Sequence, residues 1–236
     1  MRIDIWSDVV CPWCYIGKRR LETAIGDRED IEVVFHSFQL DPSAPSAEPA
    51  EGWRPASEVV ARKYGAAPEQ LEEMFGRVEQ LAKDEGLEFK HREAPWAGTI
   101  DAHRLLHLAL AEGGPQLQRS LKEALLAAYF LEARNPADHA VLTDVAAAAG
   151  LDRVRVEQVL DSDEYAEEFA ADVRQARAYG ATGVPFFVID ERYGISGAQP
   201  VEVFRDVIAR ADADAKPLVT VTGAADGDCG SDGCAI

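Results

Sequence analysis

The chain has 236 residues and a formal net charge of −18, with an isoelectric point of about 4.6. This acidic balance argues against binding to nucleic acid or to an anionic membrane surface, because both carry negative charge. No apolar run approaches the ~20 residues of a membrane-spanning helix, and no signal peptide is visible, so we expect a cytoplasmic protein that contacts no membrane. Structural disulfides are rare in that compartment, so close cysteine pairs there tend to be catalytic, redox-sensing or metal-binding.

The N-terminal stretch predicts a strand, a helix and a second strand. Residues 2–6 alternate between apolar and polar side chains, and residues 12–25 place apolar side chains at helical spacing. Residues 31–38 form a run rich in β-branched and aromatic side chains. Because a strand–helix–strand crossover is right-handed, this unit predicts a parallel pair of strands.

A long helical block is predicted in the middle of the chain. Residues 41–52 are rich in proline, serine and alanine and predict a surface connection. Residues 121–131 are strongly apolar and are expected to face the core, whereas residues 163–179 carry many charged side chains and predict a solvated helix. Glycine and proline breaks separate the predicted helices, which cover residues 56–64, 68–85, 100–112, 116–132, 138–149, 152–161 and 163–179.

The strand pattern returns after the helical block. Residues 183–190 and 193–197 predict two antiparallel strands, and residues 200–211 predict a closing helix. This order is that of an α/β thioredoxin fold with a large α-helical insertion after the first βαβ unit. We expect four parts: residues 1–45 as the N-terminal βαβ part of the thioredoxin domain, 46–180 as the inserted α-helical domain, 181–213 as the C-terminal ββα part, and 214–236 as a flexible tail.

Cys11 and Cys14 lie two residues apart, where the first strand gives way to the first helix. This spacing places Cys11 at the helix N-terminus, where unpaired N–H groups and the helix dipole favour a thiolate. Pro12 suits a first helical turn, because its missing N–H costs little there. A zinc half-site and an inert cysteine pair are the alternatives, but zinc normally needs two more ligands nearby. The context favours a thioredoxin-like redox motif.

The two cysteines have different expected roles. Cys11 is the candidate nucleophile, since it lies nearest the helix end and is by position the more exposed of the two. Cys14 lies a turn into the helix and is the candidate resolving thiol, which attacks a mixed disulfide from inside. Pro12 and Trp13 are expected to tune the pair and to offer substrate an apolar contact surface.

Other polar residues are assigned structural roles. Asp8 precedes the motif and is expected to cap or solvate the turn. His103 and His107 are four residues apart on a predicted helix, a spacing that can chelate a metal. No third ligand accompanies them, so we expect packing or surface roles and no metal site.

A second cysteine pair, Cys229 and Cys234, flanks four small residues near the C-terminus. Our hypothesis is a redox relay that exchanges with the Cys11–Cys14 pair or with an external reductant. Zinc binding by all four cysteines, and a tail with adventitious thiols, are the alternatives.

Five motifs in order carry a resemblance to a known family. They are Ile5-Trp6-Ser7-Asp8, Cys11-Pro12-Trp13-Cys14-Tyr15-Ile16-Gly17, Asp101-Ala102-His103-Arg104, Gly183-Val184-Pro185-Phe186-Phe187 and Gly194-Ile195-Ser196-Gly197-Ala198-Gln199-Pro200. Together they resemble the FrnE branch of the DsbA-like thiol oxidoreductases over residues 2–211. The resemblance implies a thioredoxin domain with an inserted helical domain. Relatives in the broader class include kappa-type glutathione transferases and 2-hydroxychromene-2-carboxylate isomerases.

The resemblance also assigns a cis-proline to Pro185, beside the cysteine pair. A cis Val184–Pro185 bond exposes the backbone of Val184, which can then form strand-like hydrogen bonds with substrate. From the residues alone, an ordinary proline leading into a strand is the alternative.

The motifs predict a protein thiol–disulfide oxidoreductase that needs no cofactor. Its expected partners are protein or small-molecule thiols and disulfides, with thioredoxin or a low-molecular-weight thiol as reductant. One alternative is a glutathione-dependent isomerase or transferase acting on a small aromatic molecule, although those relatives typically carry serine where Cys11 stands. Another is a non-catalytic peptide-binding holdase. The sequence leaves the oligomeric state open, with a dimer as one option.

Overall fold

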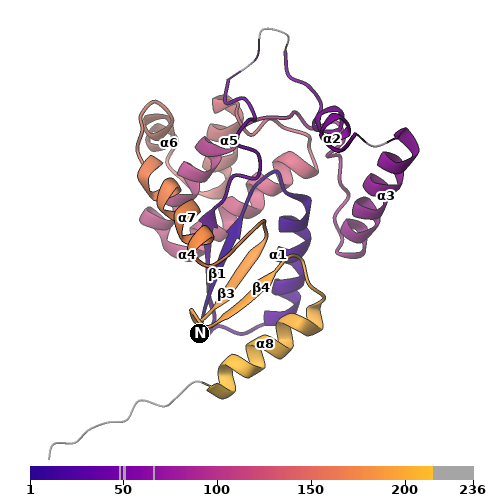
Figure 1. Cartoon of the computed structure of the whole chain (residues 1–236). Helices are drawn as coiled ribbons and strands as arrows, with labels where there is room; N and C mark the ends of the chain where they lie inside the picture. Colours follow the sequence, from indigo (N-terminus) through magenta and orange to yellow (C-terminus); the bar gives the residue numbers. More distant parts are fainter. Residues whose placement is uncertain (48, 50–51, 66, 215–236) are drawn as a thin grey trace, which may run out of the picture.

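The structure is a computed structural model that describes residues 1–47, 49, 52–65 and 67–214. Its centre is a four-stranded sheet in the order β2–β1–β3–β4 (Figure 1). β1 (Arg2–Ser7) pairs in parallel with β2 (Glu32–Ser37). On its other side β1 pairs antiparallel with β3 (Phe186–Ile189), which pairs antiparallel with β4 (Tyr193–Ser196). The predicted fold class, an α/β thioredoxin fold with a large helical insertion, is confirmed.

One face of the sheet is covered by α1 (Pro12–Ile25) and α8 (Val201–Asp214) (Figure 1). Alternate side chains of each strand point to this face, so Ile5 of β1 packs in one cluster with Leu21 of α1 and Phe204 of α8. All three side chains are almost fully buried. This core fixes the start of α1 close to the end of β1.

Helices of the insertion cover the other side and one end of the sheet (Figure 1). Trp6 and Val188 form a cluster with Ala176 of the last inserted helix, so that helix closes the second face. The inserted helices are α2 (Ala56–Tyr64), α3 (Pro68–Asp84), α4 (Ile100–Phe130), α5 (His139–Ala149), α6 (Arg153–Leu160) and α7 (Ala166–Ala178).

One prediction for this block was confirmed and another was wrong in part. The helices predicted at 100–112 and 116–132 are both present, and they meet at a kink at Gly114 within the element labelled α4. Gly114 has a left-handed φ of 67° and precedes Pro115, so the helical path is interrupted at a single residue and then resumes. The helix predicted at 163–179 is not solvated throughout, because α7 buries Asp172 against the sheet.

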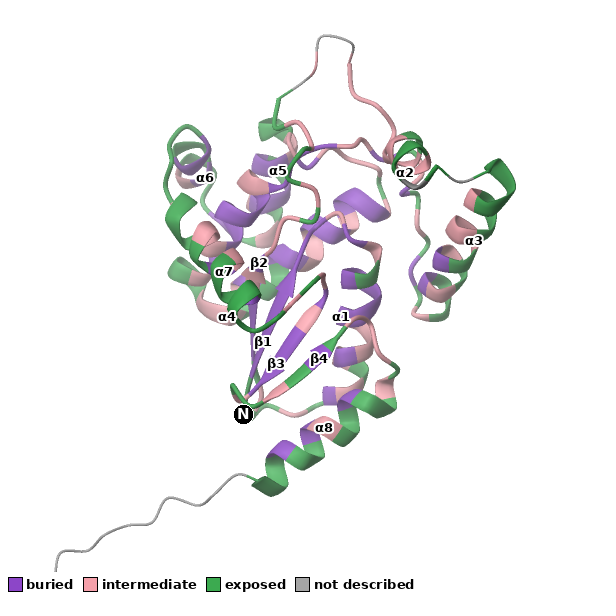
Figure 2. Cartoon of the chain, in the orientation of Figure 1, coloured by how far each residue is buried: buried purple, intermediate pink, exposed green. Residues whose placement is uncertain are grey.

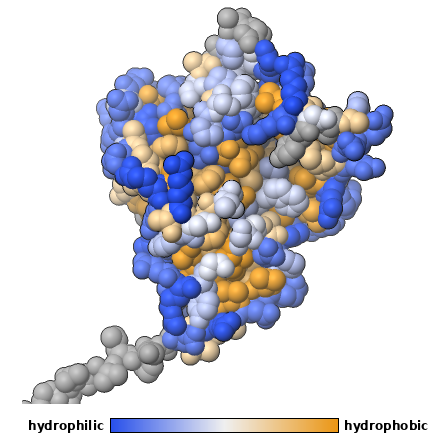
Figure 3. Space-filling view, viewed as in Figure 1, coloured by the Kyte–Doolittle hydropathy of each residue, from blue (hydrophilic) through white to orange (hydrophobic). Residues whose placement is uncertain are grey.

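Burial follows the layers of the fold. The central strands β1 and β3 and the facing sides of α1 and α4 are mostly buried, and the edge strand β4 is partly exposed (Figure 2). Among the described residues of α3, only Val78 and Ala82 are buried. Hydrophilic side chains dominate the margins of the face seen in Figure 3, and apolar side chains gather in its centre. None of the helices in the described part of the chain combines the length and apolarity needed to cross a bilayer.

Candidate active site

The cysteine pair lies at the start of α1. Cys11 is the N-cap residue with an extended backbone (φ −94°, ψ 115°), and Pro12 is the first helical residue. The carbonyl of Cys11 accepts a hydrogen bond from the Cys14 N–H at 3.0 Å, which closes the first turn. Cys11 thus sits at the positive end of the α1 dipole, as the motif indicates.

Both cysteines are reduced and both are buried, each with 2% of its surface exposed. The expectation that Cys11 is the more exposed thiol was wrong. Segments distant in the sequence cover Cys11, because the loop before β3 and the first two inserted helices line the space in front of it. Trp13, in contrast, is 38% exposed and is the part of the motif that reaches the surface.

The Val184–Pro185 loop lies against Cys11. The peptide bond between Val184 and Pro185 is cis, and the Cys11 thiol donates a hydrogen bond of 3.5 Å to the Val184 carbonyl. Gly17 of α1 makes this close approach possible, because a Cβ there would lie 3.1 Å from Cγ of Pro185. Two segments about 170 residues apart in the sequence therefore meet at one site.

The two thiols contact each other and compete for one negative charge. Burial raises the pKa of Cys14, but the hydrogen bond from Cys11 and the charge of Lys122 outweigh it and hold that pKa below its ordinary value. The hydrogen bond to Cys14, together with burial, raises the pKa of Cys11. The buried pair therefore shares one negative charge, which Lys122 stabilises.

Lys122 is a site residue that sequence reasoning missed. Its side chain comes from α4, is fully buried, and donates to the Ser7 carbonyl at 3.3 Å. Its ammonium also lies 5.7 Å from the centre of the Phe35 ring. Burial lowers the pKa of Lys122 to about 8. The available signal was a lysine inside the apolar stretch 121–131, where an uncompensated charge is costly.

Asp8 is buried beside the cysteines, so of the two roles expected for it, capping the turn is observed and solvation is not. Its carboxylate accepts from the N–H groups of Val9 and Leu40, each at 2.7 Å, and contacts His103 Nε2 at 3.3 Å. Burial raises the pKa of Asp8, but the hydrogen bond with His103 contributes most to lowering it below its usual range. His103 thus has the packing role expected for it, with a specific polar partner, and Lys122 supplies the opposite charge.

A cavity of about 440 Å³ opens in front of Cys11. Its walls are mostly apolar, and the loop containing Val184 forms one side. The polar side chain of His91 lies in the wall, is 9% exposed, and has no hydrogen-bond partner for Nδ1 within the described residues. The residues of α2 and α3 that line the cavity are Ala56, Ser57, Val60, Met74, Phe75 and Val78.

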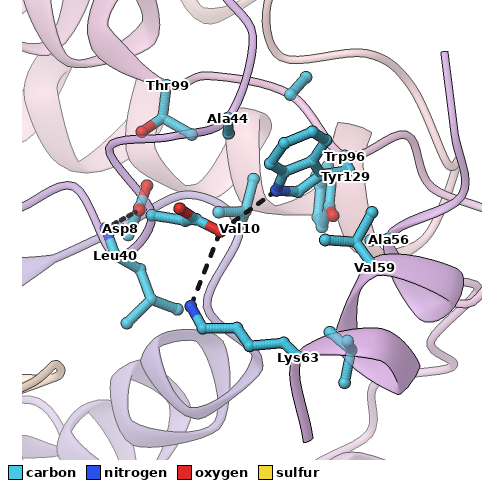
Figure 4. Close-up of a pocket in the computed structure, with 13 residues that line it drawn as sticks. Asp8, Val10, Leu40, Ala44, Ala56, Val59, Lys63, Trp96, Thr99 and Tyr129 are labelled. Atoms are coloured by element: carbon cyan, nitrogen blue, oxygen red, sulfur yellow. Dashed lines mark hydrogen bonds and ion pairs between the residues drawn. The ribbon is translucent and has the colours of Figure 1, made fainter. Parts of the chain in front are cut away.

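A second, smaller chamber of about 200 Å³, shown in Figure 4, shares part of its lining with this cavity. At its mouth, Lys63 of α2 pairs with Asp41 at 3.7 Å, and the Trp96 indole N–H donates to Asp41 at 3.3 Å. Thr99 lies in its wall and is 1% exposed. The two cavities have five lining residues in common, Val10, Leu40, Ala56, Val60 and Tyr129.

A buried ionic cluster ties α7 to the sheet next to this site. His36 of β2 contacts Asp172 of α7 at 2.8 Å through Nδ1 and Asp4 of β1 at 2.7 Å through Nε2. Asp172 also accepts from the Ser37 N–H at 2.7 Å and contacts His107 at 3.1 Å. This cluster holds the helix that leads into the loop of the cis-proline.

No group of three or more histidine, cysteine or carboxylate side chains within the described residues is placed to hold a metal ion. His103 and His107, the pair at chelating spacing, contact Asp8 and Asp172 respectively. Cys229 and Cys234 lie outside the described residues, so the structure says nothing of a relay or zinc site there.

Comparison with known proteins gives consistent matches. The family model described as "DSBA-like thioredoxin domain" matches residues 2–209. A probable DsbA oxidoreductase from Streptomyces coelicolor is 40% identical, with a TM-score of 0.86 over 100% of this chain and 99% of that one. A 2-hydroxychromene-2-carboxylate isomerase shares the fold at 15% identity and a TM-score of 0.65, over 91% of this chain and 100% of that one. Cytosolic disulfide reductase DsbM from Pseudomonas aeruginosa, solved with GSH, is 17% identical, with a TM-score of 0.62 over 90% and 100% of the two chains.

Proposed function

Since the chain belongs to the DsbA-like thioredoxin-domain family, whose members are generally thiol oxidoreductases, we propose that it exchanges its own cysteine pair with external thiols and disulfides. Cys11 is the nucleophile and Cys14 the resolving thiol. The observation that carries the proposal is the contact of the reduced Cys11 thiol with the Val184 carbonyl, at the wall of a cavity and beside a buried lysine.

The exchange proceeds in two displacement steps. A substrate thiolate attacks Sγ of Cys11 in the oxidised enzyme, the Cys11–Cys14 bond breaks, and Cys14 leaves as a thiolate. A second substrate thiolate then attacks the substrate sulfur of the mixed disulfide and expels Cys11. The substrate loses two electrons as its disulfide forms, and the two protons of its thiols end on Cys11 and Cys14. The reverse sequence reduces a disulfide substrate.

The electrostatics suit Cys14 as the leaving group. A thiol of lower pKa leaves faster in disulfide exchange, and Lys122 lowers the pKa of Cys14. Because a stabilised thiolate also stabilises the reduced enzyme, Lys122 makes the Cys11–Cys14 disulfide more oxidising. The lysine thus acts on the thiol that must carry the charge at the first step.

The proposed setting is the cytoplasm, with protein or small-molecule disulfides as substrates and thioredoxin or a low-molecular-weight thiol as reductant. A peptide substrate would align along Val184, whose backbone borders the cavity. The glutathione-dependent isomerase alternative is less well supported, because both cysteines are present and in contact.

The test is catalysed reduction of hydroxyethyl disulfide by dithiothreitol. The wild-type protein is expected to accelerate the reaction, and the Cys11→Ser variant to leave it at the uncatalysed rate. Equal rates for the two proteins would reject the oxidoreductase function. Circular dichroism of both proteins controls for folding.

A further inference from the structure

Cys11 is a buried residue in the wall of a partly open cavity, which limits what can reach it. Its surface is only 2% exposed, and α2 and α3 supply part of the wall in front of it. A disulfide on the surface of a folded protein would have to pass these wall residues to reach the Cys11 sulfur. A small molecule can enter the cavity, which at about 440 Å³ falls in the size range of small-ligand pockets.

The adjoining chamber extends this site to a second compartment. With about 200 Å³, it exceeds the ~150 Å³ of an apolar cavity that holds one benzene ring. The five shared lining residues place the two spaces side by side. For a molecule whose sulfur meets Cys11, the neighbouring chamber is therefore the nearest space that can take its body.

Each compartment contains one buried polar group without a partner among the described residues. The His91 ring packs against Phe75 and Phe89 at 5.5 and 5.6 Å between ring centres, but Nδ1 has no hydrogen bond. Thr99 precedes α4 as its N-cap residue, yet its hydroxyl makes no capping bond and has no other partner. Buried polar groups in proteins are almost always satisfied, so these two point to hydrogen bonds made with a ligand.

The charged groups of the chamber are already paired with each other. Lys63 faces Asp41, which also accepts from Trp96, and the Asp8 carboxylate is buried with three partners of its own. Apart from Thr99, the remaining wall residues are aliphatic or aromatic. Each charged side chain among the described lining residues already has a partner, which favours a ligand without a carboxylate or ammonium.

We propose that the substrate is a small uncharged thiol or disulfide, with an apolar body and a terminal hydrogen-bonding group that reaches Thr99. This inference rests on the proposed function and names its substrate class. For a dithiol, two S–H bonds of the substrate and the Cys11–Cys14 bond break. One S–S bond forms in the substrate, and the two protons pass to the cysteines.

The test compares second-order rates of reduction of the oxidised protein, measured by acid quench, alkylation and mass spectrometry. Dihydrolipoamide is the uncharged probe with an amide at its end. Dihydrolipoate replaces that amide by a carboxylate, dithiothreitol lacks the apolar body, and reduced insulin chains represent a protein. Dihydrolipoamide is expected to react at least tenfold faster than each of the others.

Two variants test whether the preference for dihydrolipoamide depends on the second chamber. Val59→Trp fills the chamber without touching the Cys11 cavity, and is expected to slow dihydrolipoamide at least tenfold while dithiothreitol stays within about twofold. Thr99→Val removes only the hydroxyl and should slow dihydrolipoamide several-fold, whereas Thr143→Val, the same change in α5, should not. If Val59→Trp fails to fold, the threonine pair decides.

The outcomes separate this inference from the proposed function. No reduction by any thiol would reject the oxidoreductase itself. Reduction by dithiothreitol without a preference for dihydrolipoamide, or equal rates in Thr99→Val and wild type, would overturn the substrate class alone. A faster reaction with insulin chains would do the same in favour of protein substrates.

Discussion

The first prediction concerns the stability of the His36→Gln variant, and its size can be worked out from the pKa of His36. The imidazole bridges Asp172 and Asp4 and stacks on Trp6 at 4.5 Å between ring centres. Burial lowers the pKa of His36, but the hydrogen bonds to the two carboxylates outweigh burial and raise it to about 9, from an ordinary value of 6.5. The variant keeps a polar side chain and removes the charge.

This shift corresponds to about 3 kcal/mol of folding free energy, at about 1.4 kcal/mol for each pKa unit. Because the pKa is raised in the folded state, the folded protein binds the proton more tightly than the unfolded chain. The contribution is fully present below pH 6.5 and is lost as the pH rises through about 9.

The assay is urea unfolding of wild type and His36→Gln at about pH 6 and about pH 10. The difference in unfolding free energy between the two proteins should shrink by about 3 kcal/mol from the lower to the higher pH. His139→Gln is the control, since His139 pairs with Asp101 on the surface and should change stability by at most ~1 kcal/mol. A His36 difference that is the same at both pH values would refute the reasoning.

Three further predictions concern the site. Lys122→Met should raise the pKa of Cys14, so the thiolate absorbance near 240 nm should appear at higher pH than in wild type; an unchanged titration would contradict the assignment. Mixed with hydroxyethyl disulfide, Cys14→Ser should accumulate a mixed disulfide on Cys11, visible as a mass adduct, as the thiolate attacks the disulfide and mercaptoethanol leaves; rapid loss of the adduct would argue against Cys14 as the resolving thiol. Gly17→Ala should cost about 1–3 kcal/mol and slow the exchange, because its Cβ would press on Pro185. Gly76→Ala, at an open helix position, should instead be neutral or stabilising in the same unfolding assay.

Local patterns sufficed for much of the fold. The helix predicted at 12–25 matches α1, because Pro12 marks its start and Gly26 its end. The strand patterns and their order predicted the parallel pair β1–β2 and the antiparallel pair β3–β4, whereas the pairing of β1 with β3 was not predicted from them. The motif also placed Cys11 at the helix N-terminus, which depends only on residues next to it in the chain.

The remaining features depend on contacts between distant segments. Lys122 lies in an apolar helix, and only the packing of α4 against the sheet brings it to Cys14. Asp172 belongs to a helix with a solvated pattern, and its partners come from β2 and α4. Burial of Cys11 follows from the position of the inserted helices. The spacing of residues along the sequence does not reveal these contacts between distant segments.

The central claim is that Cys11 and Cys14 interconvert between dithiol and disulfide. The most direct measurement is a redox titration in buffers of reduced and oxidised dithiothreitol, using a variant with Cys229 and Cys234 changed to serine. Alkylation and peptide mass spectrometry would report the state of each site cysteine. We predict a single two-electron transition that links Cys11 to Cys14. Two thiols that stay alkylated across the whole range, with no bond between them, would contradict the account.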